Sequence, residues 1–183
     1  SGLWLDTEID GKGNGTISID LDLRNPDGVR NADVTFALTS PSGRKVVSGS
    51  RSAVALDGPL SLGTFTVKSP ELWDVGSPAL YRCEVSLTAG GQTSVAESYA
   101  GFRSFRFEEK GPFYLNGRRL LLRGTHRHED HAGYGAAVPD SIVRREMKMM
   151  KNMGVNFIRL GHYQQSDIVL NLCDSLGILV WEE

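Results

Sequence analysis

The chain has little of what would tie it to a disulfide scaffold, a nucleic acid or a membrane. Only two of its 183 residues are cysteines. Cys83 and Cys173 fall in segments of different periodicity, so we expect no structural disulfide. The 20 basic and 22 acidic side chains nearly balance, which excludes the basic footprint of a nucleic-acid-binding protein. No apolar run approaches the length of a membrane span, so neither partner is expected.

The first residues of the sequence show no leader pattern. It begins Ser1-Gly2-Leu3-Trp4, without a methionine or a basic segment followed by an apolar one, so a signal peptide in the gene would lie outside it. Compartment and oligomeric state are left open. What the chain does have is 40% hydrophobic residues, enough for an ordinary buried core in one domain or a domain and a fraction.

Short alternating runs, broken by turn residues, dominate residues 1–107. In residues 17–23, isoleucine and leucine alternate with serine and aspartate, which predicts a strand with one buried face. The pattern recurs at residues 34–38 after the turn residues 25–28. Further strands are predicted at residues 45–47, 60–67, 80–87 and 94–107. About seven strands at this spacing predict an antiparallel sandwich of immunoglobulin type.

After Asn116-Gly117 the hydrophobic period changes. Pro139-Asp140 opens an amphipathic helix that Gly154 ends, and Ser166 or Asp167 caps a second helix that ends at Gly177. Apolar strands are predicted at residues 155–160 and 178–181. The order β-α-β-α-β predicts a parallel sheet.

Polar side chains follow the predicted parallel strands where each of them ends. His128 follows the first strand, Arg159 closes the second, and His162 lies just beyond it. An arginine there requires a carboxylate or a ligand, because burying an unpaired guanidinium is costly; a surface salt bridge is the plain alternative. Since the carboxyl ends of parallel strands meet at one edge, we expect these three side chains to line a common pocket.

Two other groups of residues invite a chemical interpretation. His126, His128 and His131 have the spacing H-x-H-x-x-H, but no cysteine or H-E-x-x-H helix supports zinc; we predict no metal site and interpret His126 and His131 as members of a hydrogen-bonded loop. Glu182 and Glu183 are adjacent on a strand and point to opposite faces. They cannot form the facing carboxylate pair, about 5 Å apart, of a retaining glycosidase, so we assign them supporting roles.

Several linked motifs, in order from Leu72 to the end of the chain, resemble glycoside hydrolase family 2, the group of β-galactosidases, β-glucuronidases and β-mannosidases. The matching segments are Gly101-Phe102-Arg103, Leu115-Asn116-Gly117, the R-G-x-x-R-H-E-D motif at 123–130, the R-x-S-H-Y-P motif at 159–164 and the C-D-x-x-G motif at 173–177. The chain departs from the family pattern at Gly161, in place of serine, and at Gln164, in place of proline.

The resemblance implies both a fold and an activity. An immunoglobulin-like β-sandwich in residues 1–107 would be followed by the first βα units of an incomplete (β/α)8 TIM barrel in residues 108–183. The protein would be part of a retaining β-glycosidase acting on terminal bonds of a β-linked oligosaccharide or glycoside. His128, Arg159 and His162 would bind the sugar on the non-reducing side of the scissile bond.

By the same resemblance, the acid/base and nucleophile glutamates would come from later strands. No catalytic residue is therefore expected in these 183 residues, and the piece alone should be inactive. No cofactor is implied, although a structural or activating cation in the complete enzyme is left open. The alternative is a non-catalytic carbohydrate-binding or scaffolding sandwich module. The preferred sugar, whether galactose, mannose or glucuronic acid, is not determined.

Overall fold

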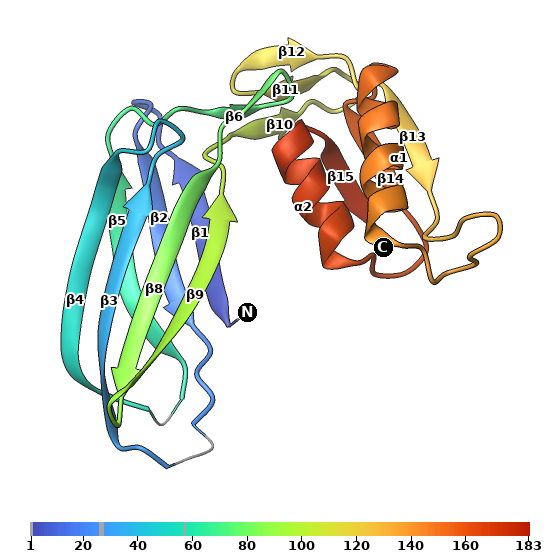
Figure 1. Ribbon diagram of the computed structural model, residues 1–183. Helices are drawn as coiled ribbons and strands as arrows, with labels where there is room; N and C mark the ends of the chain where they lie inside the picture. The colour runs from blue at the N-terminus through green and yellow to red at the C-terminus, as the bar shows by residue number, and fades with distance from the viewer. Residues whose placement is uncertain (1, 26–27, 57) are drawn as a thin grey trace. The chain divides into compact units, whose positions relative to one another are not determined.

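The computed structural model describes residues 2–25, 28–56 and 58–183, and these form two compact units (Figure 1). The first unit contains the residues up to Leu72 and Ala79–Arg103; the second contains Trp73–Pro78 and Ser104–Glu183. Part of the predicted turn at residues 25–28, Pro26-Asp27, lies outside the described residues. The domain boundary expected after residue 107 falls inside the second unit.

The first unit is a sandwich of two antiparallel sheets. One sheet has the order β1-β2-β5, and the other has the order β4-β3-β8-β9. Their bounds are β1 Leu3–Ile9, β2 Gly15–Leu21, β3 Asn31–Thr39, β4 Lys45–Ala55, β5 Leu60–Val67, β8 Tyr81–Ala89 and β9 Gln92–Ala100. This arrangement confirms the predicted immunoglobulin-like sandwich.

Local sequence explains the strands and their turns. In β2 every second residue is buried, as expected for a strand with one face in the core. Gly90 and Gly91 join β8 to β9 with φ values of 56° and 80°, which only glycine adopts without strain and which suits a two-residue hairpin. The predicted strand at residues 94–107 is wrong in one respect: it is two strands, β9 and β10 (Phe105–Phe107), and β10 pairs with β11 (Phe113–Leu115) instead.

The core of the first unit is a cluster of buried apolar side chains. Ile17, Ile19, Val34 and Leu38 are each wholly inaccessible to solvent. Phe102, the central residue of the Gly-Phe-Arg motif, is equally buried.

A close fit holds the Phe102 ring. It packs edge-on against Tyr81, with ring centroids 4.9 Å apart. A Cβ at Gly15 would lie 2.6 Å from the same ring, so the glycine is needed for close packing.

The second unit begins with short antiparallel pairs. A hairpin of β6 (Trp73–Asp74) and β7 (Ser77–Pro78) is followed by the sheet β10-β11-β12, in which β12 is Arg118–Leu120. Asn116 fixes the connection between them: its backbone N–H donates to the Ser104 carbonyl, and its side-chain Nδ2 donates to the Trp73 carbonyl.

A parallel sheet of β13 (Gly124–Arg127), β14 (Phe157–Leu160) and β15 (Leu179–Glu182) completes the unit. Its crossovers are α1 (Asp140–Asn152) and α2 (Asp167–Leu176), so the predicted order β-α-β-α-β is confirmed. Figure 1 shows the two helices next to each other beside these strands. Gly177 ends α2 in the left-handed conformation, with φ of 71°, as expected of a C-terminal glycine.

The helices cover one face of the parallel sheet. Ile158 and Leu160 of β14 are fully buried in a cluster with Val143, Met147 and Val169 of the helices. Neither cysteine forms a disulfide, as expected: both are buried and free. Among the described residues, no helix combines the length and apolarity needed to cross a bilayer.

Replacing Phe102 with alanine should destabilise the first unit by about 3–5 kcal/mol, because it leaves a cavity beneath Tyr81. Urea unfolding followed by circular dichroism measures the change. Trp4→Ala is the matched control, since Trp4 is 68% exposed and should change stability by about 0.5 kcal/mol or less. Equal effects from the two variants would contradict this description of the core.

Candidate functional site

Strand alternation determines which side chains face away from the helices. In β14, Ile158 and Leu160 face the helices, so Arg159 between them points to the opposite face. The register pairs Arg159 with His126 on β13 and with Trp181 on β15. His128 lies two residues after His126, and Glu183 two residues after Trp181. These positions therefore share a side of the sheet near the carboxyl ends of its strands.

Arg159 is the centre of the resulting cluster. Its Nη2 donates to both oxygens of Glu183, at 2.8 and 2.9 Å, and its Nε donates to Oε1 at 3.0 Å. The carboxylate that a strand-end arginine requires is therefore Glu183. Nη1 lies 3.2 Å from His126 Nε2, and Nη2 lies 3.2 Å from His162 Nδ1.

His162 is held by the same carboxylate. Its Nδ1 lies 3.0 Å from Glu183 Oε2, closer than it lies to Arg159, and a proton on Nδ1 satisfies this contact. We assign this tautomer from the hydrogen bonds. It leaves the lone pair on Nε2, which is free to accept a hydrogen bond or to bind a cation.

The three imidazoles lie against one another. The ring centroids of His126 and His128 are 4.6 Å apart, those of His128 and His162 are 5.3 Å apart, and those of His126 and His162 are 5.6 Å apart. Desolvation, and then the positive charge of Arg159, lower the pKa of His126. Hydrogen bonds from His162 and Arg159 lower the pKa of Glu183. At neutral pH the cluster thus combines an ionised carboxylate with a neutral His126.

A second set of contacts anchors the loops on which the cluster depends. Glu129 accepts hydrogen bonds from the backbone N–H and hydroxyl of Ser166, the residue that caps α2. Tyr163 accepts a bond from the Glu129 N–H at 2.9 Å. The loop after β13 and the loop after β14 are therefore tied together.

The helix-facing side of the sheet contains a buried arginine. Arg127 is 6% exposed, and its Nη1 donates to Gln165 Oε1 at 2.6 Å. The carboxylate of Glu146 lies 3.9 Å from Arg127 Nη2 and 2.6 Å from His131 Nδ1. Glu182 accepts the Gln165 backbone N–H at 3.1 Å, so Glu182 and Glu183 hold different partners, as their alternation requires.

The structure brings together all three side chains that the sequence singled out, His128, Arg159 and His162. Sequence reasoning missed the place of His126 in the cluster, and it gave Glu183 a supporting role without predicting its pairing with Arg159. The interpretation of His126 as a loop residue is wrong, because it lies in β13 beside Arg159. The sequence feature that could have indicated this is the H-x-H spacing, because residues two apart on a strand point to the same side. Glu183 was signalled by the unpaired charge of Arg159.

Gly161 makes room for this arrangement. A Cβ at this position would lie 2.9 Å from His126 Nε2 and 3.4 Å from a Glu183 oxygen. A serine here, as in the family pattern, would therefore displace His126. The neighbouring Gln164 is exposed, and nothing in the structure explains its identity.

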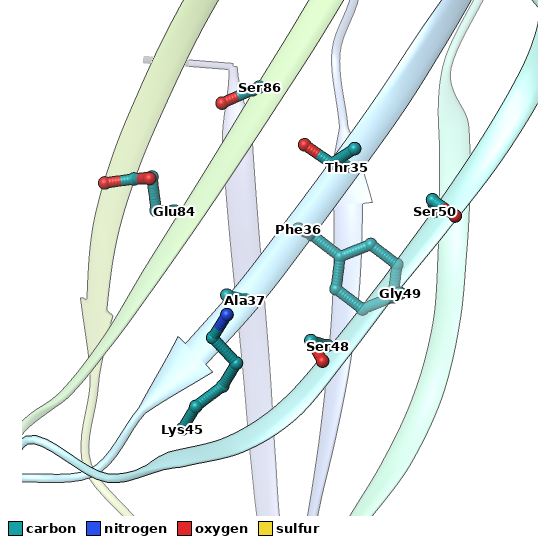
Figure 2. Close-up of a pocket in the computed structure, with 9 residues that line it drawn as sticks. All are labelled: Thr35, Phe36, Ala37, Lys45, Ser48, Gly49, Ser50, Glu84 and Ser86. Atoms are coloured by element: carbon teal, nitrogen blue, oxygen red, sulfur yellow. The ribbon is translucent and has the colours of Figure 1, made fainter.

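The first unit has a cavity of a different kind (Figure 2). It has a volume of about 370 Å³ and lies over β3, β4 and β8. Its polar lining includes Lys45, Glu84 and the hydroxyls of Ser48, Ser50 and Ser86. No histidine lines it, so it offers none of the chemistry of the imidazole cluster.

Comparison with known proteins identifies the family. The model of glycosyl hydrolases family 2 matches residues 1–103, and the model of the family 2 TIM barrel domain matches residues 107–183. The chain belongs to glycosyl hydrolase family 2. The expected fold, a sandwich followed by the first βα units of a TIM barrel, is thereby confirmed.

Individual members of glycosyl hydrolase family 2 are similar over long segments. The crystal structure of a β-glucuronidase from Parabacteroides merdae has a TM-score of 0.96 and 48% identity, over 100% of this chain and 23% of that one. A putative β-glucuronidase from Formosa agariphila is 49% identical over 64% of this chain and 14% of its own length. A Kluyveromyces lactis β-galactosidase is 31% identical over 98% of this chain and 18% of its own length. The chain spans less than a quarter of the length of these relatives.

The carboxyl group of Glu183 should titrate below an ordinary glutamate, and Arg159→Ala should move its pKa back up, because a charged donor is lost. Carbon-13 NMR of the labelled carboxyl measures this. A lowered folded-state pKa also means that the contact stabilises the fold above the unfolded-state pKa, and that this stabilisation is lost as pH falls through the folded-state pKa. His131→Ala is the control, and an unchanged titration in Arg159→Ala would contradict the pairing.

Proposed function

We propose that this chain is part of a retaining β-glycosidase that hydrolyses terminal β-glycosidic bonds, and that His128, Arg159 and His162 form part of its sugar-binding subsite. One observation carries the proposal: in a member of glycosyl hydrolase family 2, these three polar side chains gather at the carboxyl ends of adjacent parallel strands. That end of the sheet is where TIM-barrel enzymes bind their substrates.

The chemistry of the cluster suits a sugar. Imidazole nitrogens accept or donate hydrogen bonds to hydroxyl groups, and a guanidinium donates in a fixed fork. With Nδ1 of His162 held by Glu183, its Nε2 accepts a bond from a sugar hydroxyl. Such bonds lower the barrier when they strengthen as the ring flattens toward an oxocarbenium ion.

The cleavage step needs carboxylates that we place outside these 183 residues. A retaining glycosidase uses two carboxyl groups about 5–5.5 Å apart, one as acid/base and one as nucleophile. Glu183 is committed to Arg159 and His162, and Glu182 is committed to Gln165. In this proposal the sandwich of the first unit is the domain that precedes the catalytic one, and residues 108–183 are the start of the catalytic domain.

Two classes of substrate follow from the relatives. The Parabacteroides merdae and Formosa agariphila proteins are named as β-glucuronidases, and the Kluyveromyces lactis protein as a β-galactosidase. We therefore propose a β-linked oligosaccharide or glycoside as the substrate of the complete enzyme. Aryl β-glucuronides and β-galactosides are the substrates to test first.

The isolated chain should not hydrolyse p-nitrophenyl β-glucuronide or β-galactoside, because it lacks both catalytic carboxylates. Release of p-nitrophenol measures the activity. Turnover at rates typical of a glycosidase would contradict this expectation. If that turnover were retained after Glu183→Gln and Glu182→Gln, catalysis would depend on other residues of this chain.

Within an active enzyme, Arg159→Ala and His162→Ala should each lower kcat/KM by roughly tenfold to a hundredfold, the effect of losing hydrogen bonds of about 1.5–3 kcal/mol. A suitable host is the Parabacteroides merdae β-glucuronidase with its corresponding segment replaced by these 183 residues. His131→Ala, whose side chain contacts Glu146, is the matched control. Wild-type kcat/KM in both variants would exclude these residues from the subsite.

A further inference from the structure

We infer that His126, His128 and His162 form a binding site for a divalent transition-metal ion of the zinc type. This inference goes beyond sugar binding and does not rest on it. Three of the four histidines in the chain contribute. One ring nitrogen of each lies within 4.8 Å of a ring nitrogen of the other two, and all three residues are exposed.

The spacing is within reach of a coordinated ion. Zinc–nitrogen bonds of about 2.0–2.1 Å in a tetrahedron place ligand nitrogens about 3.4 Å apart. The cluster must therefore close by about 1.4 Å at its widest separation. Rotations of exposed imidazole side chains provide this without moving the strands.

Glu183 prepares one of the ligands. Its Oε2 holds Nδ1 of His162 at 3.0 Å, which presents the Nε2 lone pair to the ion. Metal-binding histidines typically donate their other nitrogen to a carboxylate in this way, and the contact fixes the tautomer and increases ligand basicity. The H-x-H spacing of His126 and His128 does not by itself indicate such a carboxylate, which the structure shows at His162.

The charge of Arg159 does not oppose the ion, because it is compensated. Glu183 accepts three hydrogen bonds from the guanidinium, so the pair is neutral as a unit. Nη1 lies at similar distances from the two nitrogens of His126, 3.2 and 3.4 Å. Those near-equal distances place it against the ring face, and the in-plane lone pair of His126 remains available to a metal.

This inference departs from the expectation from sequence, which was no metal site, and its ligands are not the three histidines of the H-x-H-x-x-H spacing. His131 belongs to the H-x-H-x-x-H pattern, but its Nδ1 is bound to Glu146 at 2.6 Å. His162, from the next loop, takes its place. Three histidines with a fourth position open to solvent are the donor set of zinc sites that keep an exchangeable ligand.

Metal binding and sugar binding then exclude each other. A bound ion occupies the lone pairs of His128 and His162, which the proposed function assigns to sugar hydroxyls. This consequence, unlike metal binding itself, rests on the proposed function: in a complete enzyme the ion would compete with the substrate.

The test uses the 183-residue chain without a histidine tag. Zinc alone is titrated by calorimetry, and cobalt(II) is used as a coloured substitute that absorbs strongly in the visible range when tetrahedral. We expect one ion per chain. His126→Ala, His128→Ala and His162→Ala should each weaken binding at least tenfold, and Glu183→Gln should weaken it roughly 10–100-fold.

His131→Ala is the matched control, and its affinity should equal that of the wild type. Circular dichroism establishes that each variant is folded. Weak binding without a defined stoichiometry, or binding that survives loss of His126, His128 or His162, overturns the inference. Neither result bears on the glycosidase proposal, because hydrolysis by the hybrid enzyme is measured in the presence of a chelator.

Discussion

The candidate site depends on the two-residue alternation of a single strand, β14. Ile158 and Leu160 must lie beneath the helices to complete the apolar core of the second unit. The side chain between them, Arg159, is then forced to the opposite face of the sheet. A shift of one residue in strand register would bury the guanidinium and expose two apolar side chains. The packing of the core therefore also determines the position of Arg159.

The electrostatic balance of the cluster follows from that placement. An isolated arginine among three imidazoles would repel both a cation and any protonated histidine. Glu183 compensates the charge, and it also orients His162 through a second oxygen. The cluster is therefore a set of hydrogen-bond donors and acceptors around one ion pair, a combination suited to hydroxyl groups.

Local patterns predicted much of this structure. Alternation in residues 17–23 indicated β2, and Gly154 and Gly177 marked the ends of the two helices correctly. The gathering of His128, Arg159 and His162 followed from the common edge of parallel strands. What local patterns could not give was the pairing of distant segments. The sequence did not predict that β10 is separate from β9. The pairing of β10 with β11 depends on the fold and is not visible in the local sequence of β10. The supporting role of Glu183 was predicted, but its pairing with Arg159 was not, because that pairing also joins distant segments.

The hairpin at Trp73–Pro78 makes the second unit discontinuous in sequence. The indole Nε1 of Trp73 donates to the Asp174 carbonyl, and the ammonium group of Lys151 donates to the carbonyls of Val75 and Gly177. A protease cut or a gene split near residue 103 would therefore not release two self-contained pieces. The C-terminal product would lose six residues, Trp73–Pro78, which form hydrogen bonds with residues at the ends of its helices. Evolutionary shuffling of this barrel onto another sandwich must carry that hairpin along.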